Sequence, residues 1–133
     1  MSSNNSYKKF PSNNLEKILG EIKEKGCLMG VLLTSRDGTL LSRNFNGELD
    51  GSGFSAMIAS VIESAEGLMD TTGEKKIVKV ITELSDQSII IIRLTKRFLL
   101  ILIIGNESKV EELLNTLDNY IQKIVEIVEI FQI

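Results

Sequence analysis

The sequence predicts a single α/β domain whose elements follow the order α-β-β-α-β-β-β-α. Two apolar runs, residues 89–92 and 98–104, lack any alternation with polar residues, which is typical of strands covered on both faces. Residues 54–69 carry apolar side chains at the spacing of an amphipathic helix. Residues 28–43 contain two apolar segments around a turn, which predicts a β-hairpin. Helices are therefore expected on both faces of a sheet.

The chain is expected to form one domain behind a short leader. Its 133 residues fit one hydrophobic core. Residues 1–13 are rich in Ser and Asn and contain the only proline, which predicts a flexible leader before a domain over residues 14–133. Asn13 is expected to cap the first helix, with Glu16 completing an arrangement like the capping box. This helix is expected to end at Gly26.

The turn of the predicted hairpin has the sequence Ser-Arg-Asp-Gly at residues 35–38. Gly38 lies where such a turn requires a positive φ. Arg36 and Arg43 lie on this hairpin, where a guanidinium can reach the phosphates of a nucleotide bound to a partner. A solvated surface position for both arginines is the simpler interpretation.

The second helix is expected over residues 52–71, with Ser52 as its N-cap. Eight of its apolar side chains are expected to face the core. They are Phe54, Met57, Ile58, Val61, Ile62, Ala65, Leu68 and Met69. A stripe of Ala, Ser and Gly residues beside this face would let another helix approach closely. The acidic residues Glu63, Glu66 and Asp70 are expected on the solvated side.

Three strands are expected over residues 75–84, 88–94 and 98–104. The first of them contains lysines and a glutamate among its apolar residues, and charges of this kind mark an edge strand. Gly105 and Asn106 are expected to end the last strand and cap the third helix. The sheet is thus followed by a C-terminal helix.

The C-terminal segment, residues 124–133, is apolar over more of its surface than one sheet can cover. The apolar surface that the sheet cannot cover indicates a contact with a second protomer or a partner. The alternative is that the segment frays or wraps its own domain. Its β-branched residues suit a strand as well as a helix. Both conformations stay open.

Composition argues against several classes of function. A formal net charge of −3 with dispersed lysines provides no basic stripe for nucleic acid. The chain has no histidine, the commonest general base and metal ligand, and no nucleophile motif, so an enzyme with its own active site is not expected. Residues 51–56 match the dinucleotide-binding pattern, but they follow a polar loop instead of a tight strand-to-helix turn, so no cofactor is expected.

The chain is expected in a reducing, cytoplasmic environment. Cys27 is its only cysteine, so no intramolecular disulfide is possible, and a buried, unreactive thiol is expected. The N-terminus lacks the apolar segment of a signal peptide. No apolar run approaches the roughly 20 residues that a bilayer requires, so direct membrane insertion is not expected.

Residues 30–41, with the sequence Gly-Val-Leu-Leu-Thr-Ser-Arg-Asp-Gly-Thr-Leu-Leu, resemble the Roadblock/dynein light chain family. The order of elements and the apolar second helix extend the resemblance over residues 14–128. It implies a five-stranded antiparallel sheet of profilin-like type, with the second helix on one face and the other two helices on the opposite face. It also implies a homodimer, or a heterodimer with a paralogous Roadblock protein, in which edge strands pair and second helices lie side by side.

Members of this family typically bind or regulate small Ras-like GTPases, and some form scaffolds at membranes or link dynein to cargo. The compact chain is most similar to the prokaryotic members. The resemblance therefore implies a homodimeric module that binds and regulates a small Ras-like GTPase, as an activator or as a platform. The alternatives are a structural adaptor subunit of a larger motor-like or membrane-scaffold complex, and a small-molecule sensor.

Two groups of residues are expected to make contacts with other chains. The dimer-interface residues are Phe54, Met57, Ser60, Val61, Ser64, Val78 and Val80. The residues for possible contacts with a partner are Arg36, Arg43, Ile127, Ile130 and Phe131. None of them is expected to act as a catalytic group.

Overall fold

The computed structural model describes residues 12–74, 76–77 and 79–130. It contains three helices and five strands in the expected order. The helices are α2 (Ser12–Gly26), α3 (Gly51–Thr72) and α4 (Val110–Ile130), and the strands are β1 (Gly30–Ser35), β2 (Leu40–Phe45), β3 (Lys79–Glu83), β4 (Ser88–Arg93) and β5 (Phe98–Ile104). The strands form one antiparallel sheet in the order β2-β1-β5-β4-β3, which confirms the predicted fold class.

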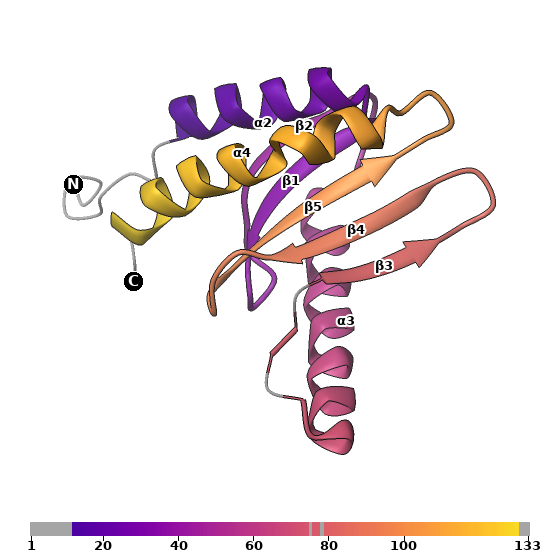
Figure 1. The fold of residues 1–133 in the computed structure, drawn as a ribbon, viewed down its shortest axis with the longest axis vertical. Coiled ribbons are helices and arrows are strands. Elements are labelled where there is room, and N and C mark those ends of the chain that lie inside the picture. The colour runs from indigo at the N-terminus through magenta and orange to yellow at the C-terminus, as the bar shows by residue number, and fades with distance from the viewer. Residues whose placement is uncertain (1–11, 75, 78, 131–133) are drawn as a thin grey trace.

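Helices cover both faces of the sheet, as the apolar runs predicted (Figure 1). Helices α2 and α4 lie side by side on one face, and α3 lies on the other. Alternate residues of the central strand β5 serve the two layers: Leu100 and Leu102 pack toward α2 and α4, while Leu99 and Ile101 pack toward α3. Strand β5 is buried along almost its whole length because it pairs on both edges and is covered on both faces.

The β1–β2 turn has the predicted geometry. Ser35 N–H donates to the carbonyl of Thr39 at 2.8 Å, and Gly38 has a φ of +97°. The Asp37 carboxylate accepts hydrogen bonds from the Ser35 hydroxyl and from the backbone N–H of Thr39. Arg36 N–H donates to the carbonyl of Arg97 at 2.7 Å, which fastens this turn to the β4–β5 turn.

The predicted starts of the first and third helices were wrong. Helix α2 begins at Ser12, so Asn13 lies inside its first turn. Asparagine is tolerated there because the backbone N–H groups of a first turn have no intrahelical acceptor with which its side chain would compete. Helix α4 begins at Val110 instead of directly after Asn106. The intervening residues form a turn in which the Ser108 hydroxyl accepts from Gly105 N–H and donates to the Cys27 carbonyl, both at 3.0 Å.

The N-cap of α3 is Asp50, and the prediction of Ser52 was wrong. The Asp50 carboxylate accepts a hydrogen bond from Gly53 N–H at 3.2 Å. A carboxylate at this position satisfies an unpaired donor and complements the positive end of the helix dipole. Ser52 lies inside the first turn and bonds the same carboxylate through its hydroxyl.

Replacing Asp50 with alanine is expected to lower the free energy of unfolding by about 1 kcal/mol, because Gly53 N–H loses its acceptor. Chemical denaturation followed by circular dichroism measures the change. Glu48→Ala is the matched control, because Glu48 is exposed two residues earlier in the same loop. Equal midpoints for the two variants would contradict the capping role.

Cys27 is exposed, so the prediction of a buried thiol was wrong. Helix α2 ends at Gly26 as expected, but the positive φ of +49° that closes the helix falls on Cys27. Leu28 N–H bonds back to the carbonyl of Lys23 at 2.9 Å. A left-handed residue directly after a helix is a common way to end it, and here it leaves the cysteine side chain at the surface.

The sheet is covered less completely toward β3 than the sequence predicted. In β4 only Ile91 is buried, and its other three isoleucines are half-buried. Strand β3 starts at Lys79 and is mostly exposed, which confirms the predicted edge position. Lys75 and Val78, placed in this strand by the sequence, lie outside the described residues. Coverage falls off here because α2 packs on β1 and β2, and the buried strand residues on the α2–α4 side of the sheet belong to β1 and β5.

Candidate protein-interaction surface

Helix α3 is only partly packed on the sheet. Its buried residues are Gly51, Ser55, Ile58 and Ile62, all within its first twelve positions. In Figure 1 its C-terminal half extends beyond the sheet. Met57 and Leu68 are 64% and 68% exposed, so the prediction that they face the core was wrong. The sheet below α3 is wide enough to bury one stripe of the helix but not its whole apolar arc.

The exposed side of α3 combines large apolar and small residues. Met57, Ser60, Ser64, Gly67 and Leu68, which we call the α3 outer face, are all exposed. A Cβ built on Gly67 meets no atom within 4 Å. At 3.6 residues per turn these positions fall on one side of the helix. The α3 outer face is therefore an apolar ridge with room for another helix beside it.

Strand β3 is joined to α3 through a shared apolar cluster. Val80 is half-buried and packs against the same apolar cluster as Phe54 and Val61 of α3. Ile81 and Leu84 are exposed. Within the described part of the chain, β3 pairs only with β4, so its outer edge offers unpaired backbone groups. The predicted interface residues other than Val78 lie on α3 and β3. Leu68, among the most exposed side chains of this region, was not among the predicted interface residues.

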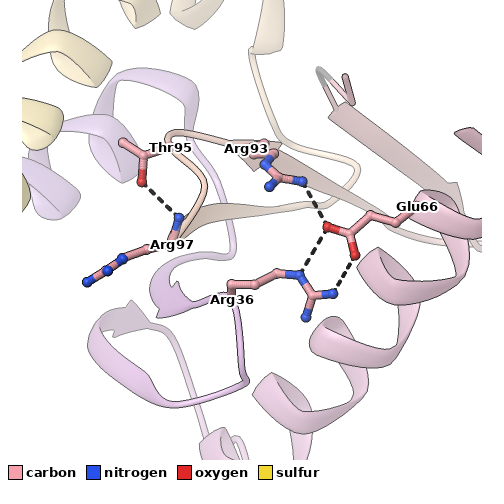
Figure 2. Close-up of polar contacts among 5 residues, drawn as sticks. All are labelled: Arg36, Glu66, Arg93, Thr95 and Arg97. Carbon is pink, nitrogen blue, oxygen red and sulfur yellow. Dashed lines mark hydrogen bonds and ion pairs between the residues drawn. The ribbon is translucent and has the colours of Figure 1, made fainter. Parts of the chain in front are cut away.

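Three charged side chains join α3 to the end of the sheet (Figure 2). The Glu66 carboxylate accepts two bonds from the Arg36 guanidinium, at 2.5 and 3.2 Å, and one from Arg93 at 3.0 Å. Arg36 belongs to the β1–β2 turn and Arg93 ends β4. Glu66 was expected to be solvated, but it is half-buried between two arginines that are distant in sequence.

The ion pairs shift the protonation equilibria in the expected directions. Hydrogen bonding from Arg36 lowers the pKa of Glu66 below its ordinary value of 4.5, with a smaller contribution from Arg93. The bond to Glu66 likewise raises the pKa of Arg36. Hydrogen bonds from Ser35 and Thr39 lower the pKa of Asp37. Glu66 is therefore ionised, and Arg36 is charged, at any pH near neutrality.

Glu66→Gln is expected to remove a small, pH-dependent part of the stability, within about 1 kcal/mol because the cluster is partly solvated. A lowered folded-state pKa stabilises the fold above the unfolded value near 4.5, and the benefit is lost as the pH falls through the folded-state pKa. The difference between wild type and variant should therefore be largest at pH 6–7 and vanish near pH 3 in urea melts. A difference independent of pH would contradict this assignment.

The two hairpin arginines do not form one site. Arg36 reaches Glu66, whereas Arg43 is exposed and donates to the carbonyl of Leu49 at 3.1 Å, beside the start of α3 at Gly51. Glu66 lies fifteen positions after Gly51, which corresponds to about 22 Å along the helix. The two arginines therefore meet α3 at distant points, and Arg43 is the more accessible.

The C-terminal segment is helical up to Ile130, which settles the alternative between helix and strand for that part. Ile124 and Val128 are buried against α2 and the sheet. Ile127 is half-buried against the same cluster, while Ile130 is 71% exposed. Phe131 lies outside the described residues. The last turn of α4 therefore exposes the apolar side chain of Ile130.

The surfaces that could hold a small ligand are shallow. A hollow of about 420 Å³ lies between the β1–β2 and β4–β5 turns, with Leu41 and Phe98 among its lining residues. Among the described residues, no group of three His, Cys, Asp or Glu side chains could hold a metal ion. The glycine-rich segment at residues 51–56 is the first turn of α3, where the Asp50 carboxylate occupies the position that a phosphate would need.

None of the helices in the described residues is long and apolar enough to cross a bilayer. Large apolar side chains are exposed on the α3 outer face, on and just after β3, and on α4 at Leu114 and Ile130. Such surfaces suit contact with other protein chains better than binding of a small substrate, which requires an enclosed pocket.

Comparisons with known proteins agree with this description. The family model described as the Roadblock/LC7 domain matches residues 14–104. A search of curated protein sequences gave no significant match. Among solved structures, Myxococcus xanthus MglB superimposes with a TM-score of 0.82 at 16% identity, covering 91% of this chain and 92% of that one.

Two further solved structures are similar over nearly their full lengths. The gliding protein MglB from Thermus thermophilus has a TM-score of 0.81 at 14% identity, with 90% of this chain and 91% of that chain covered. An MglB structure with a tetrameric arrangement has a TM-score of 0.84 at 14% identity, covering 92% and 93%. At these identities the likeness establishes a shared fold.

Proposed function

Because the chain belongs to the Roadblock/LC7 domain family, we propose that it is a homodimeric protein-binding module that engages and regulates a small Ras-like GTPase. One observation supports the proposal above all: the α3 outer face and the outer edge of β3 are both uncovered in the described part of the chain, and Phe54, Val61 and Val80 join the two elements in one apolar cluster. The family resemblance supplies the GTPase as the class of partner. The module works in the cytoplasm, where such GTPases act.

The homodimer proposed here joins β3 to β3 of a second copy across a twofold axis. Antiparallel pairing would extend the five-stranded sheet to ten strands and satisfy the open edge. The α3 helices would then lie side by side, with Met57 and Leu68 buried between them and the small side chains of Ser60, Ser64 and Gly67 permitting close approach. Phe54, Val61, Val78 and Val80 complete the proposed interface.

The GTPase contact is proposed for surfaces away from the dimer axis. Arg43, Ile127, Ile130 and Phe131 are the candidate residues, with Arg43 and Ile130 the most accessible of the described ones. Arg36 was also expected to reach a partner, but in the structure its guanidinium is paired with Glu66. The module would act by holding or rearranging the GTPase's own residues, since no catalytic group of this chain is proposed.

A nucleotide-dependent capture experiment tests this function. The tagged protein is incubated with lysate of the source organism in GDP and, in parallel, in a non-hydrolysable GTP analogue, and bound proteins are identified by mass spectrometry. A Ras-like GTPase enriched in one nucleotide state supports the proposal, and its hydrolysis rate with and without the module then separates activator from platform. Recovery of a fixed assembly that ignores the nucleotide would overturn it in favour of the adaptor.

A further inference from the structure

The C-terminal half of α3 lacks the apolar anchorage of its N-terminal half. Ile58 and Ile62 bury their side chains on Leu32, Ile91 and Ile101 of the sheet. None of the α3 residues after Ile62 is buried. In this half of the helix, the side-chain hydrogen bonds to other elements are those that Glu66 accepts from Arg36 and Arg93. The C-terminal half of α3 is therefore attached to the rest of the domain by the ion pairs of Glu66 and not by a buried apolar residue.

The space beside Glu66 is open instead of close-packed. A hollow of about 310 Å³ is lined by Glu66 and Met69 of α3 and by Arg93, Leu94 and Thr95 near the end of β4. Loosely packed apolar groups gain little from dispersion contacts. Figure 2 shows two arginines reaching Glu66 from different elements, Arg36 from the β1–β2 turn and Arg93 from the end of β4.

Glu66 also lies on the side of α3 away from the proposed dimer contact. At 100° per residue, Met57 and Leu68 fall about 180° and 200° around the helix from Glu66. A change at Glu66 thus leaves the α3 outer face chemically intact. Any effect on dimerisation would have to act through the position of the helix.

We propose that Glu66 is a positioning residue which, through Arg36 and Arg93, holds the projecting half of α3 in the orientation that pairs with a second copy of this chain. The inference rests on the proposed homodimer and adds the residue that orients α3 for it. Because Arg36 belongs to the β1–β2 turn, the cluster also couples that turn to the dimer interface.

The charged residues around Glu66 determine how dimer affinity is expected to depend on salt concentration. Arg36 and Arg93 face Glu66 directly, Lys76 and Lys96 line the same hollow, and Glu63 and Asp37 act on Arg36. Glutamine at position 66 would leave the two arginines facing each other without a compensating charge. Dimer affinity is therefore expected to fall with added salt in the wild type and to depend less on salt in Glu66→Gln.

The test measures dimer dissociation by sedimentation velocity for wild type, Glu66→Gln and the control Asp70→Asn. Asp70 lies one turn further along α3, is exposed and loses the same charge. Glu66→Gln should raise the dimer Kd roughly fivefold, as loss of two partly solvated ion pairs would, while Asp70→Asn leaves it unchanged. Glu66→Arg should weaken the dimer further, and adding Arg36→Glu should recover part of the loss.

Hydrogen exchange separates positioning from a general loss of stability. In Glu66→Gln, amides of residues 63–72 should exchange faster while those of residues 51–62 stay unchanged. A dimeric wild type with equal Kd values for Glu66→Gln and Asp70→Asn would overturn the positioning role and leave the homodimer standing. A wild type that is monomeric at all concentrations would overturn the homodimer itself, and the positioning role with it.

Discussion

Replacing Met57 and Leu68 together with aspartate is expected to convert the proposed homodimer into a folded monomer. Both side chains are mostly exposed in the single chain, so the substitution removes little that holds the domain together. Burying an apolar side chain of this size contributes about 1.5–3 kcal/mol. The variant loses this contribution and places four carboxylates in the proposed interface, so the dimer Kd should rise by at least about 100-fold. Light scattering after size exclusion measures the mass directly.

A matched control shows whether the effect belongs to the α3 outer face. Leu114 of α4 is also an exposed leucine, but it lies on the opposite layer of the domain. Leu114→Asp makes the same chemical change and should remain dimeric, and circular dichroism should show that all variants keep their helix content. A double variant that stays dimeric at micromolar concentration would rule out this surface as the interface.

The fold could be predicted because its signals are local. The unbroken apolar run of β5 predicts a strand buried on both faces, and it is the central strand. The charges around residues 75–83 predict an edge strand, and β3 is the edge. The Asp37-Gly38 turn predicts the hairpin. Each of these features depends on the residues that carry it and on their immediate neighbours.

Part of the candidate surface could not be predicted from the sequence, because the exposure of side chains on α3 depends on how much of the helix the sheet covers. Met57 and Leu68 belong to the same periodic pattern as Ile58 and Ile62, and periodicity does not reveal how wide a stripe of the helix the sheet can bury. The small residues beside them did indicate a helix contact. Exposure within an amphipathic pattern is thus a tertiary property that needs the layout of the sheet.

Glu66 illustrates a second limit. Its partner Arg36 is thirty positions earlier and Arg93 is twenty-seven later, and no local spacing rule connects them. A lone glutamate on a helix is usually solvated, so the prediction followed the general case. Only the packing of α3 across the ends of β1 and β4 brings the three charges together.

The largest effect on the fold itself is expected from Ile101→Ala. Ile101 is fully buried in the central strand, between Leu32 on β1 and Ile91 on β4 and in the layer packed beneath α3. Truncation removes apolar contact on every side and leaves a cavity in a close-packed layer, which costs about 2–5 kcal/mol. Urea denaturation at one fixed protein concentration measures the change, since dimerisation would otherwise shift the midpoint.

Ile130→Ala is the control for this experiment, because Ile130 is the same residue type and is 71% exposed at the end of α4. Its free energy of unfolding should change by no more than about 0.5 kcal/mol, as for an ordinary surface position. A loss of several kcal/mol at position 101 is a large fraction of the roughly 5–15 kcal/mol that stabilises a domain. If the two variants unfolded together, the layer between α3 and the sheet would not be the close-packed core that supports the projecting helix, and the orientation of the α3 outer face would need another cause.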